Sequence, residues 1–134
     1  MKINIPIFLL SSFSAKTFAG DWPSWRGTGR TGVSTETGLL QEWPEGGPRQ
    51  LWISKEAGLG YSSFSVVDGR LFTMGAFDKK EKLLVFDAQT GKKLWEIEVG
   101  DLLTNNWGNG PRSCPTVADG QVYALGGRGN LVCA

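Results

Sequence analysis

The sequence predicts an all-β protein built from short antiparallel strands. Its 134 residues contain a strand, turn and strand pattern that recurs at an offset of 51 residues. Both copies turn at an Asp-Gly pair, which suits a tight hairpin because Asp tolerates the left-handed backbone conformation and Gly adopts it without steric cost. The 19 Gly, 6 Pro and 6 Trp residues are typical of a chain with many turns and large packed rings.

Residues 1–19 have the pattern of a secretory signal peptide. Lys2 is followed by an apolar run over residues 3–10, and small residues lead to Ala19. We expect cleavage after Ala19 and a soluble periplasmic or secreted product. The apolar run is too short for a membrane-spanning helix, so no membrane anchor is expected. Residues 20–49 are expected to form an irregular N-terminal segment.

An internal repeat follows this segment. Residues 62–75 align with residues 113–126, and five of the fourteen positions are identical. The two hairpin turns are predicted at Asp68-Gly69 and at Asp119-Gly120. Similarity at a fixed period is typical of a propeller or a solenoid.

The first copy continues through two further strands, so residues 61–99 are expected to form a four-stranded antiparallel blade. In its last strand Trp95, Ile97 and Val99 share one face, which is the period of two of a half-buried strand. The second copy, residues 112–134, stops within its third strand and is expected to be a partial blade.

Residues 50–55 resemble the last strand of the blade, with Trp52 at the position of Trp95. This segment precedes the first copy as residues 93–98 precede the second. We therefore expect it to be a ring-closing strand whose three partners lie outside this sequence. Residues 50–134 as a whole are expected to be propeller blades.

Four residues of the blade carry a recognisable motif. Asp87, Thr90, Gly91 and Trp95 match the DxxTGxxxW core of the tryptophan-docking repeat, so the chain resembles the pyrroloquinoline-quinone-like, or quinoprotein-like, β-propeller repeat proteins. Residues 21–27 also resemble the N-terminal region of exported bacterial members. The resemblance implies four-stranded blades in which the motif Trp docks on a neighbouring blade. Because propellers close with about four to eight blades, we expect an N-terminal fragment of about two blades that needs the remaining blades or another protein.

The resemblance leaves two classes of function open. Some members are quinoprotein dehydrogenases that use pyrroloquinoline quinone and usually calcium, and others are non-catalytic, such as the scaffold lipoprotein of outer-membrane barrel assembly. We favour an exported binding or scaffold module that is not catalytic by itself, with the quinone and calcium expected only in a complete parent ring. The alternative is the N-terminal part of a quinone-dependent alcohol dehydrogenase of the polyol or polyvinyl alcohol type. Surface glycan or polymer binding is a third class, which the sequence neither supports nor opposes.

Charge and composition exclude other functions. The 14 basic and 13 acidic residues nearly balance, so the chain lacks the positive charge that nucleic-acid binding requires. The absence of His excludes Ser-His-Asp and Cys-His catalysis and zinc sites that use imidazole.

The longest connection, residues 100–112, is the most site-like stretch. Asn105 and Asn106 could supply amide donors and acceptors, Trp107 a stacking plane and Arg112 a contact to a carboxylate or quinone oxygen. These four residues are the candidate cofactor-binding set. The alternative is that Asn and Gly serve a turn and that Trp107 caps the core of the blade.

Other motifs favour structural roles. Residues 27–32 match GxGxxG but lack a preceding strand and a following helix, so a surface loop is expected. Cys114 and Cys133 are expected to be free and mostly buried, with a disulfide as the alternative. Asp87 is expected to accept hydrogen bonds within its turn rather than bind a metal. The charges of residues 78–82 are expected to lie at a solvated hairpin tip.

Overall fold

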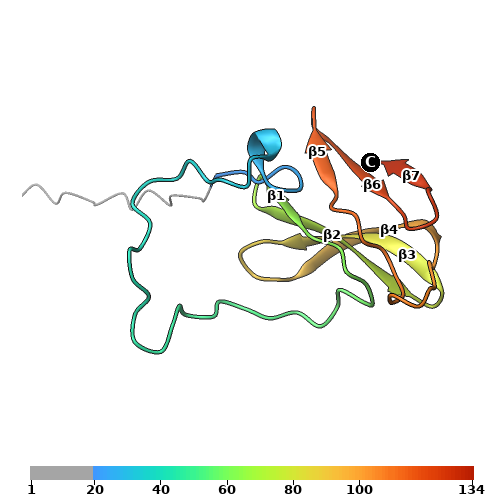
Figure 1. The fold of residues 1–134 in the computed structure, drawn as a ribbon, viewed down its shortest axis with the longest axis horizontal. Helices are drawn as coiled ribbons and strands as arrows, with labels where there is room; N and C mark the ends of the chain where they lie inside the picture. The colour runs from blue at the N-terminus through green and yellow to red at the C-terminus, as the bar shows by residue number, and fades with distance from the viewer. Residues whose placement is uncertain (1–19) are drawn as a thin grey trace, which may run out of the picture.

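A computed structural model describes residues 20–134, which form seven strands in two open antiparallel sheets (Figure 1). The predicted all-β class is confirmed. One short 3-10 turn, η1 (Thr28–Arg30), lies within the GxGxxG stretch, which is otherwise a loop as expected. The expected signal peptide, residues 1–19, lies outside the described residues.

The first sheet, sheet A, contains four strands in sequence order. They are β1 (Ser65–Val67), β2 (Arg70–Phe77), β3 (Lys80–Asp87) and β4 (Lys93–Asp101). Every neighbouring pair is antiparallel. The four-stranded unit expected over residues 61–99 is therefore present, and its last strand extends to Asp101.

The second sheet, sheet B, contains β5 (Thr116–Ala118), β6 (Gln121–Leu125) and β7 (Leu131–Cys133) in the same antiparallel order. Its register copies that of sheet A. Val66 pairs with Leu71 in sheet A, and Val117 pairs with Val122 in sheet B at the same offset of 51. The repeat detected in the sequence is thus also a repeat of hydrogen-bonded pairing.

The two hairpin turns have the backbone conformation that the Asp-Gly pairs predict. Asp68 and Gly69 have φ of 50° and 70°, and Asp119 and Gly120 have φ of 51° and 76°. Both positions of each turn are left-handed, as a two-residue hairpin that follows the twist of its strands requires. Local sequence alone determines this feature.

The core lies between the two sheets. Sheet A contributes five buried side chains and sheet B contributes two: Phe72, Met74, Leu83, Val85 and Val99, and Val122 and Ala124. Sheet B lies over one face of sheet A (Figure 1). Because side chains alternate between the faces of a strand, Val122 and Ala124 point toward sheet A while Tyr123 and Leu125 point away from it.

The two sheets therefore stack with unlike faces in contact. Phe72 and Tyr123 are equivalent positions of the repeat, yet Phe72 is in the core between the sheets and Tyr123 is on the outer face of sheet B. Such a head-to-tail arrangement leaves one face of the last sheet open to the same kind of contact.

The N-terminal segment joins the two sheets at one edge. Trp22 makes an antiparallel bridge with Val66 of β1, with N···O distances of 2.7 and 2.9 Å. The carbonyl of the next residue, Pro23, accepts a hydrogen bond from Val117 of β5 at 2.8 Å. After η1 the chain runs through a long loop before it returns to β1 (Figure 1).

Residues 50–55 pair with no strand among the described residues, and their expected role as a ring-closing strand, whose three partners were expected outside this sequence, stays a prediction. An extended segment becomes a strand only when a neighbour supplies hydrogen-bond partners along it, and none of the described residues does so here. The segment instead leads to the outer face of sheet A, where Leu59 bridges Ala76 and the carbonyl of Ala57 lies against Gly75.

Candidate binding site

The indole ring of Trp52 packs against the turn between β3 and β4. Its Nε1 donates a hydrogen bond of 3.0 Å to the carbonyl of Ala88. A Cβ added at Gly91, which has φ of 71°, would lie 2.5 Å from Cε3 of the ring. Only glycine permits both this conformation and this approach. The residues of the predicted docking motif thus meet the ring of Trp52, which precedes the blade.

Asp87 organises that turn, as the sequence indicated. Its Oδ1 accepts hydrogen bonds from Gln89 N, Thr90 N and Thr90 Oγ1 at 3.1, 2.8 and 2.7 Å. These bonds, above all the one from the Thr90 hydroxyl, lower the pKa of Asp87. Ala88 N donates to Gly69 O at 2.9 Å, which ties the turn to the first hairpin.

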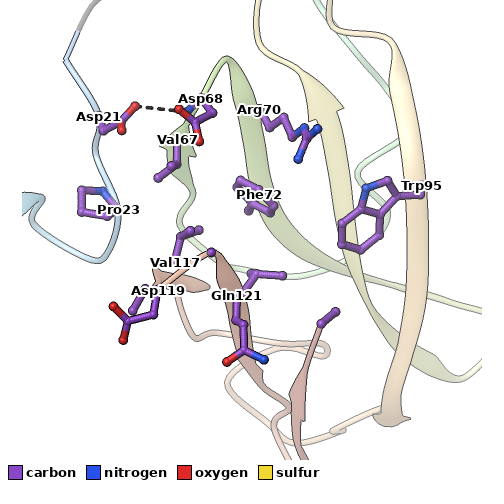
Figure 2. A pocket seen from close by; sticks show the side chains of 14 residues that line it. Asp21, Pro23, Val67, Asp68, Arg70, Phe72, Trp95, Val117, Asp119 and Gln121 are labelled. Atoms are coloured by element: carbon purple, nitrogen blue, oxygen red, sulfur yellow. Dashed lines mark hydrogen bonds between the residues drawn. The ribbon is translucent and has the colours of Figure 1, made fainter.

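Trp95 occupies the corresponding position at the end of sheet A, beside a pocket of about 410 Å³ between the two sheets (Figure 2). Gly120, the counterpart of Gly69, also lines this pocket. No segment equivalent to residues 88–91 covers the ring within residues 20–134, and Trp95 remains 36% exposed. The turn of residues 88–91 thus covers the ring of Trp52, whereas no described residue covers the ring of Trp95 in this way.

The pocket has an apolar wall and a polar rim (Figure 2). Phe72 and Trp95 line it from sheet A, and Gln121 lines it from sheet B. Asp21 Oδ1 accepts a hydrogen bond of 3.1 Å from Asp68 N at its edge. An indole ring surrounded by side-chain and backbone hydrogen-bonding groups can receive a peptide turn.

The candidate cofactor residues lie elsewhere, in the loop that links the sheets. Asn105 Oδ1 accepts hydrogen bonds from Trp107 N at 2.9 Å and from Arg112 Nη2 at 3.1 Å. Arg112 Nη2 also donates to Gly108 O at 2.7 Å. Asn106 is exposed next to them, and none of the four predicted residues lines the pocket.

Trp107 points into solvent, with 89% of its side chain exposed. The alternative that this ring caps the core of the blade is therefore wrong. The polar side chains around it hold the loop in shape, and the ring itself packs on nothing that would bury it. Loop composition could not distinguish these outcomes, because the direction of a loop side chain is set by tertiary contacts.

Glu81 is a buried structural position that sequence reasoning missed. It belongs to the charged stretch expected at a solvated tip, yet it is fully buried. Its Oε1 accepts a hydrogen bond from Leu103 N at 3.0 Å and its Oε2 accepts one from Gly127 N at 2.6 Å. The period of two that places Leu83 and Val85 in the core also places Glu81 on that face, and this signal could have located it.

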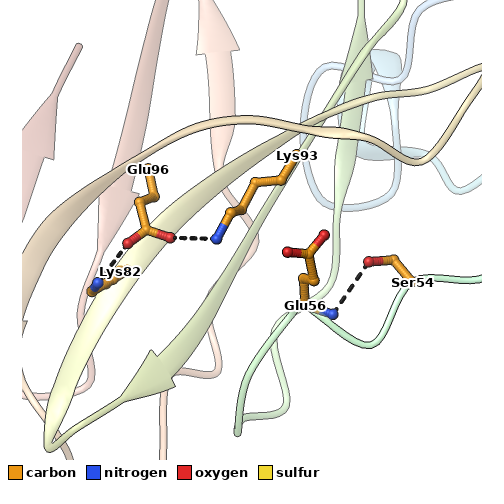
Figure 3. A network of polar contacts seen from close by, with 5 residues as sticks. All are labelled: Ser54, Glu56, Lys82, Lys93 and Glu96. Carbon is orange, nitrogen blue, oxygen red and sulfur yellow. Dashed lines mark hydrogen bonds and ion pairs between the residues drawn. The ribbon is translucent and has the colours of Figure 1, made fainter.

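The outer face of sheet A carries a network of ion pairs (Figure 3). Glu96 Oε1 lies 2.5 Å from Lys82 Nζ and its Oε2 lies 3.0 Å from Lys93 Nζ. The hydrogen bond from Lys82, followed by that from Lys93, lowers the pKa of Glu96. Nearby, Glu56 N donates to Ser54 Oγ at 3.2 Å (Figure 3). These partly exposed pairs cover apolar strand surface and fit a structural role.

Both cysteines are free. Cys114 is half-buried, and desolvation raises the pKa of its thiol. Cys133 is exposed on the outer face of sheet B, so the expectation that both thiols are mostly buried is wrong for this residue. Its counterpart Val85 is buried only because sheet B covers it, whereas no further sheet among the described residues covers Cys133.

Comparison with family models, with curated proteins and with solved structures finds no match to this chain. Within residues 20–134, no group of three or more His, Cys, Asp or Glu is placed to hold a metal ion. The same residues contain no helix that is long and apolar enough to cross a membrane. The arrangement of the two sheets and of the two Trp rings therefore carries the functional argument.

Proposed function

We propose that this chain is an exported binding or scaffold module made of propeller-type blades, which is not catalytic by itself. It works by packing a further antiparallel sheet, supplied by more blades or by another protein, on the outer face of sheet B. The observation that supports this proposal is the head-to-tail stacking of two sheets with the same register.

Equivalent side chains in the two sheets differ in how much of their surface is exposed. Met74 and Leu83 of sheet A are 3% and 0% exposed because sheet B covers them. Leu125 pairs with Leu131 in sheet B as Met74 pairs with Leu83 in sheet A, and these two counterparts on the outer face of sheet B are 47% and 66% exposed. A third sheet packed as the second one is would bury these side chains, at a gain of about 25 cal/mol for each Å² of apolar surface.

The exposed ring of Trp95 offers a second contact, to a turn. Trp52 shows the contact that this chain uses for an indole ring, namely a glycine under the ring and a carbonyl that accepts from Nε1. The pocket at Trp95 has room for such a turn beside Gly120. The pocket lies on the side of sheet B that faces sheet A, opposite to Leu125 and Leu131, so a turn docked on Trp95 and a sheet docked on the outer face are two separate contacts.

Sedimentation of the purified chain tests the proposal with a second copy as the available sheet. We expect the sedimentation coefficient to rise with concentration from about 1 to about 100 μM, since one open apolar face gives at least weak association. The double substitution Leu125→Lys and Leu131→Lys should abolish this rise. The matched control, Leu39→Lys and Leu40→Lys, alters two equally exposed side chains of the N-terminal segment and should leave it unchanged.

A monodisperse monomer at the highest concentration would contradict the scaffold proposal, and so would equal effects of the two double variants. The non-catalytic part has its own test. The chain is mixed with pyrroloquinoline quinone and Ca²⁺, and dye-linked oxidation of primary and secondary alcohols is followed. We expect no turnover, and reproducible turnover would refute this part while leaving the sedimentation result valid.

A further inference from the structure

The loop of residues 102–112 presents one aromatic ring on a rigid base. Trp107 is 89% exposed, which exceeds the exposure of every other large apolar side chain in the described part of the chain. The backbone of the loop is closed by Gly108 N donating to Asn105 O at 3.2 Å and by Gly110 N donating to Leu103 O at 2.9 Å. The position of the ring is thus defined before any ligand arrives.

Further contacts fasten the loop to sheet A and to the segment that precedes β1. Leu103 N donates to the buried carboxylate of Glu81 at 3.0 Å. On the other side, Tyr61 N donates to Pro111 O at 2.9 Å, and the ring of Tyr61 lies so close to Gly108 that a Cβ there would be 2.4 Å from its hydroxyl. The guanidinium of Arg112 stands 5.9 Å from the centre of the same ring. A preorganised loop loses little conformational entropy when it binds.

The surroundings of Trp107 are polar and nearly neutral. Its exposed neighbours in the loop include the amides Asn105, Asn106 and Asn109, with glycine at positions 108 and 110. The single charged side chain between residues 102 and 113 is Arg112, which is engaged with Asn105 and Gly108. The exposed ring of Tyr61 lies against Gly108 and adds a second aromatic surface to this amide-rich loop. A polyanion would need more positive charge than the loop carries.

We propose that this loop binds a neutral polysaccharide, with one pyranose ring stacked on Trp107. A pyranose has a flat face of C–H groups that suits an indole and a rim of hydroxyls that suits amide side chains. The amide of Asn106, which is exposed beside the ring, supplies hydrogen bonds to those hydroxyls. This surface is separate from the Trp95 pocket, so it is independent of the proposed packing of a further sheet.

Affinity electrophoresis of the full chain tests this inference. The gels contain hydroxyethyl cellulose, soluble β-1,3-glucan, neutral xylan or glycol chitin in its N-acetylated form, with alginate as a polyanion. We expect retardation by at least one neutral polymer and none by alginate. Trp107→Ala should weaken the retained complex by about tenfold or more, since stacking buries apolar area on one face of an indole. The control Trp43→Ala removes another ring that is 71% exposed, and it should retain binding.

Two additional measurements keep the result interpretable. Near-ultraviolet circular dichroism and the urea midpoint establish that the Trp107→Ala variant is folded, which its exposure predicts. Asn106→Ala should weaken retention less than Trp107→Ala does. Absence of retardation on all four neutral polymers would overturn the inference, as would equal retention of the wild-type chain and the Trp107→Ala variant. A Trp107→Ala variant that alters self-association but not retention would assign the ring to a protein contact and would also overturn it.

Discussion

Removing the charge of Glu81 should weaken the attachment of sheet B and the linking loop to sheet A and lower the stability of the fold. The carboxylate is fully buried and accepts one backbone hydrogen bond on each oxygen, from Leu103 in the loop and from Gly127 beyond β6. Gly126 and Gly127 leave room for it, since a Cβ at either position would lie within 3.1 Å of a Glu81 oxygen. The substitution Glu81→Gln keeps the shape and changes only the charge and one acceptor.

The size of the effect follows from those two bonds. A carboxamide has one acceptor oxygen, so either Leu103 N or Gly127 N would face an NH₂ group in a buried site. An unsatisfied buried donor costs about 1–3 kcal/mol, and loss of the charge weakens the remaining bond by about 1 kcal/mol. Relief of the desolvation of the carboxylate opposes this. We expect a net loss of about 2–3 kcal/mol in the free energy of unfolding.

Urea denaturation monitored by Trp fluorescence measures this loss. With a slope of about 1–3 kcal/mol per molar urea for a domain of this size, the midpoint should fall by about 0.7–3 M. The matched control is Glu98→Gln on the exposed side of β4, where the carboxylate pairs with Lys80 at 2.8 Å and is 53% exposed. It should cost less than about 0.5 kcal/mol. Equal midpoints for the two variants would show that the buried carboxylate does not hold the two sheets together.

Three further predictions follow from the turns and thiols. Gly91→Ala should lower the urea midpoint more than Gly129→Ala does. Both glycines have positive φ, but only an alanine at position 91 would also place a methyl group against an indole ring. Equal losses in the two variants would attribute the effect to backbone strain alone. The hydroxyl of Thr90 is the main cause that lowers the pKa of Asp87 below its ordinary value of 3.8. The ionised carboxylate therefore contributes its full stability above pH 3.8, and this stability is lost as the pH falls through the lower pKa of the folded state. The acid limb of the urea midpoint should therefore flatten in Asp87→Asn, and an unchanged limb would count against the turn. At pH 8, Cys133 should react with a thiol reagent faster than Cys114, because burial raises the pKa of Cys114. Mass spectrometry follows the modification, and modification of Cys114 first would contradict the exposure of Cys133 on the outer face of sheet B.

Short-range patterns predicted the strands of the described residues well. The four strands of sheet A, their order and both Asp-Gly turns follow from alternation and turn chemistry, which depend on neighbours in sequence. Residues 50–55 are unpaired among the described residues, and their role as a ring-closing strand stays a prediction, because strand pairing also requires a partner in space. Glu81 was mispredicted, since its charge was weighed above its position on the core face.

The sequence predicted the candidate site less completely than it predicted the strands. The residues of the linking loop were singled out correctly as a group, but their composition could not show that Asn105 and Arg112 bind each other while Trp107 faces solvent. Likewise, the sequence match between Trp52 and Trp95 did not reveal that the ring of Trp52 packs against Gly91. It also did not reveal that the ring of Trp95 borders an open pocket.

The sequence by itself determined the class of fold, the repeat and the conformation of its turns. These features are periodic or local, so backbone sterics and side-chain alternation specify them residue by residue. Only the tertiary structure decided that unlike faces of the two sheets meet, that a buried carboxylate links them, and that none of the described residues covers the outer face of sheet B. Contacts between distant segments depend on which surfaces fit together in space, and no pattern along the chain encodes that fit in advance.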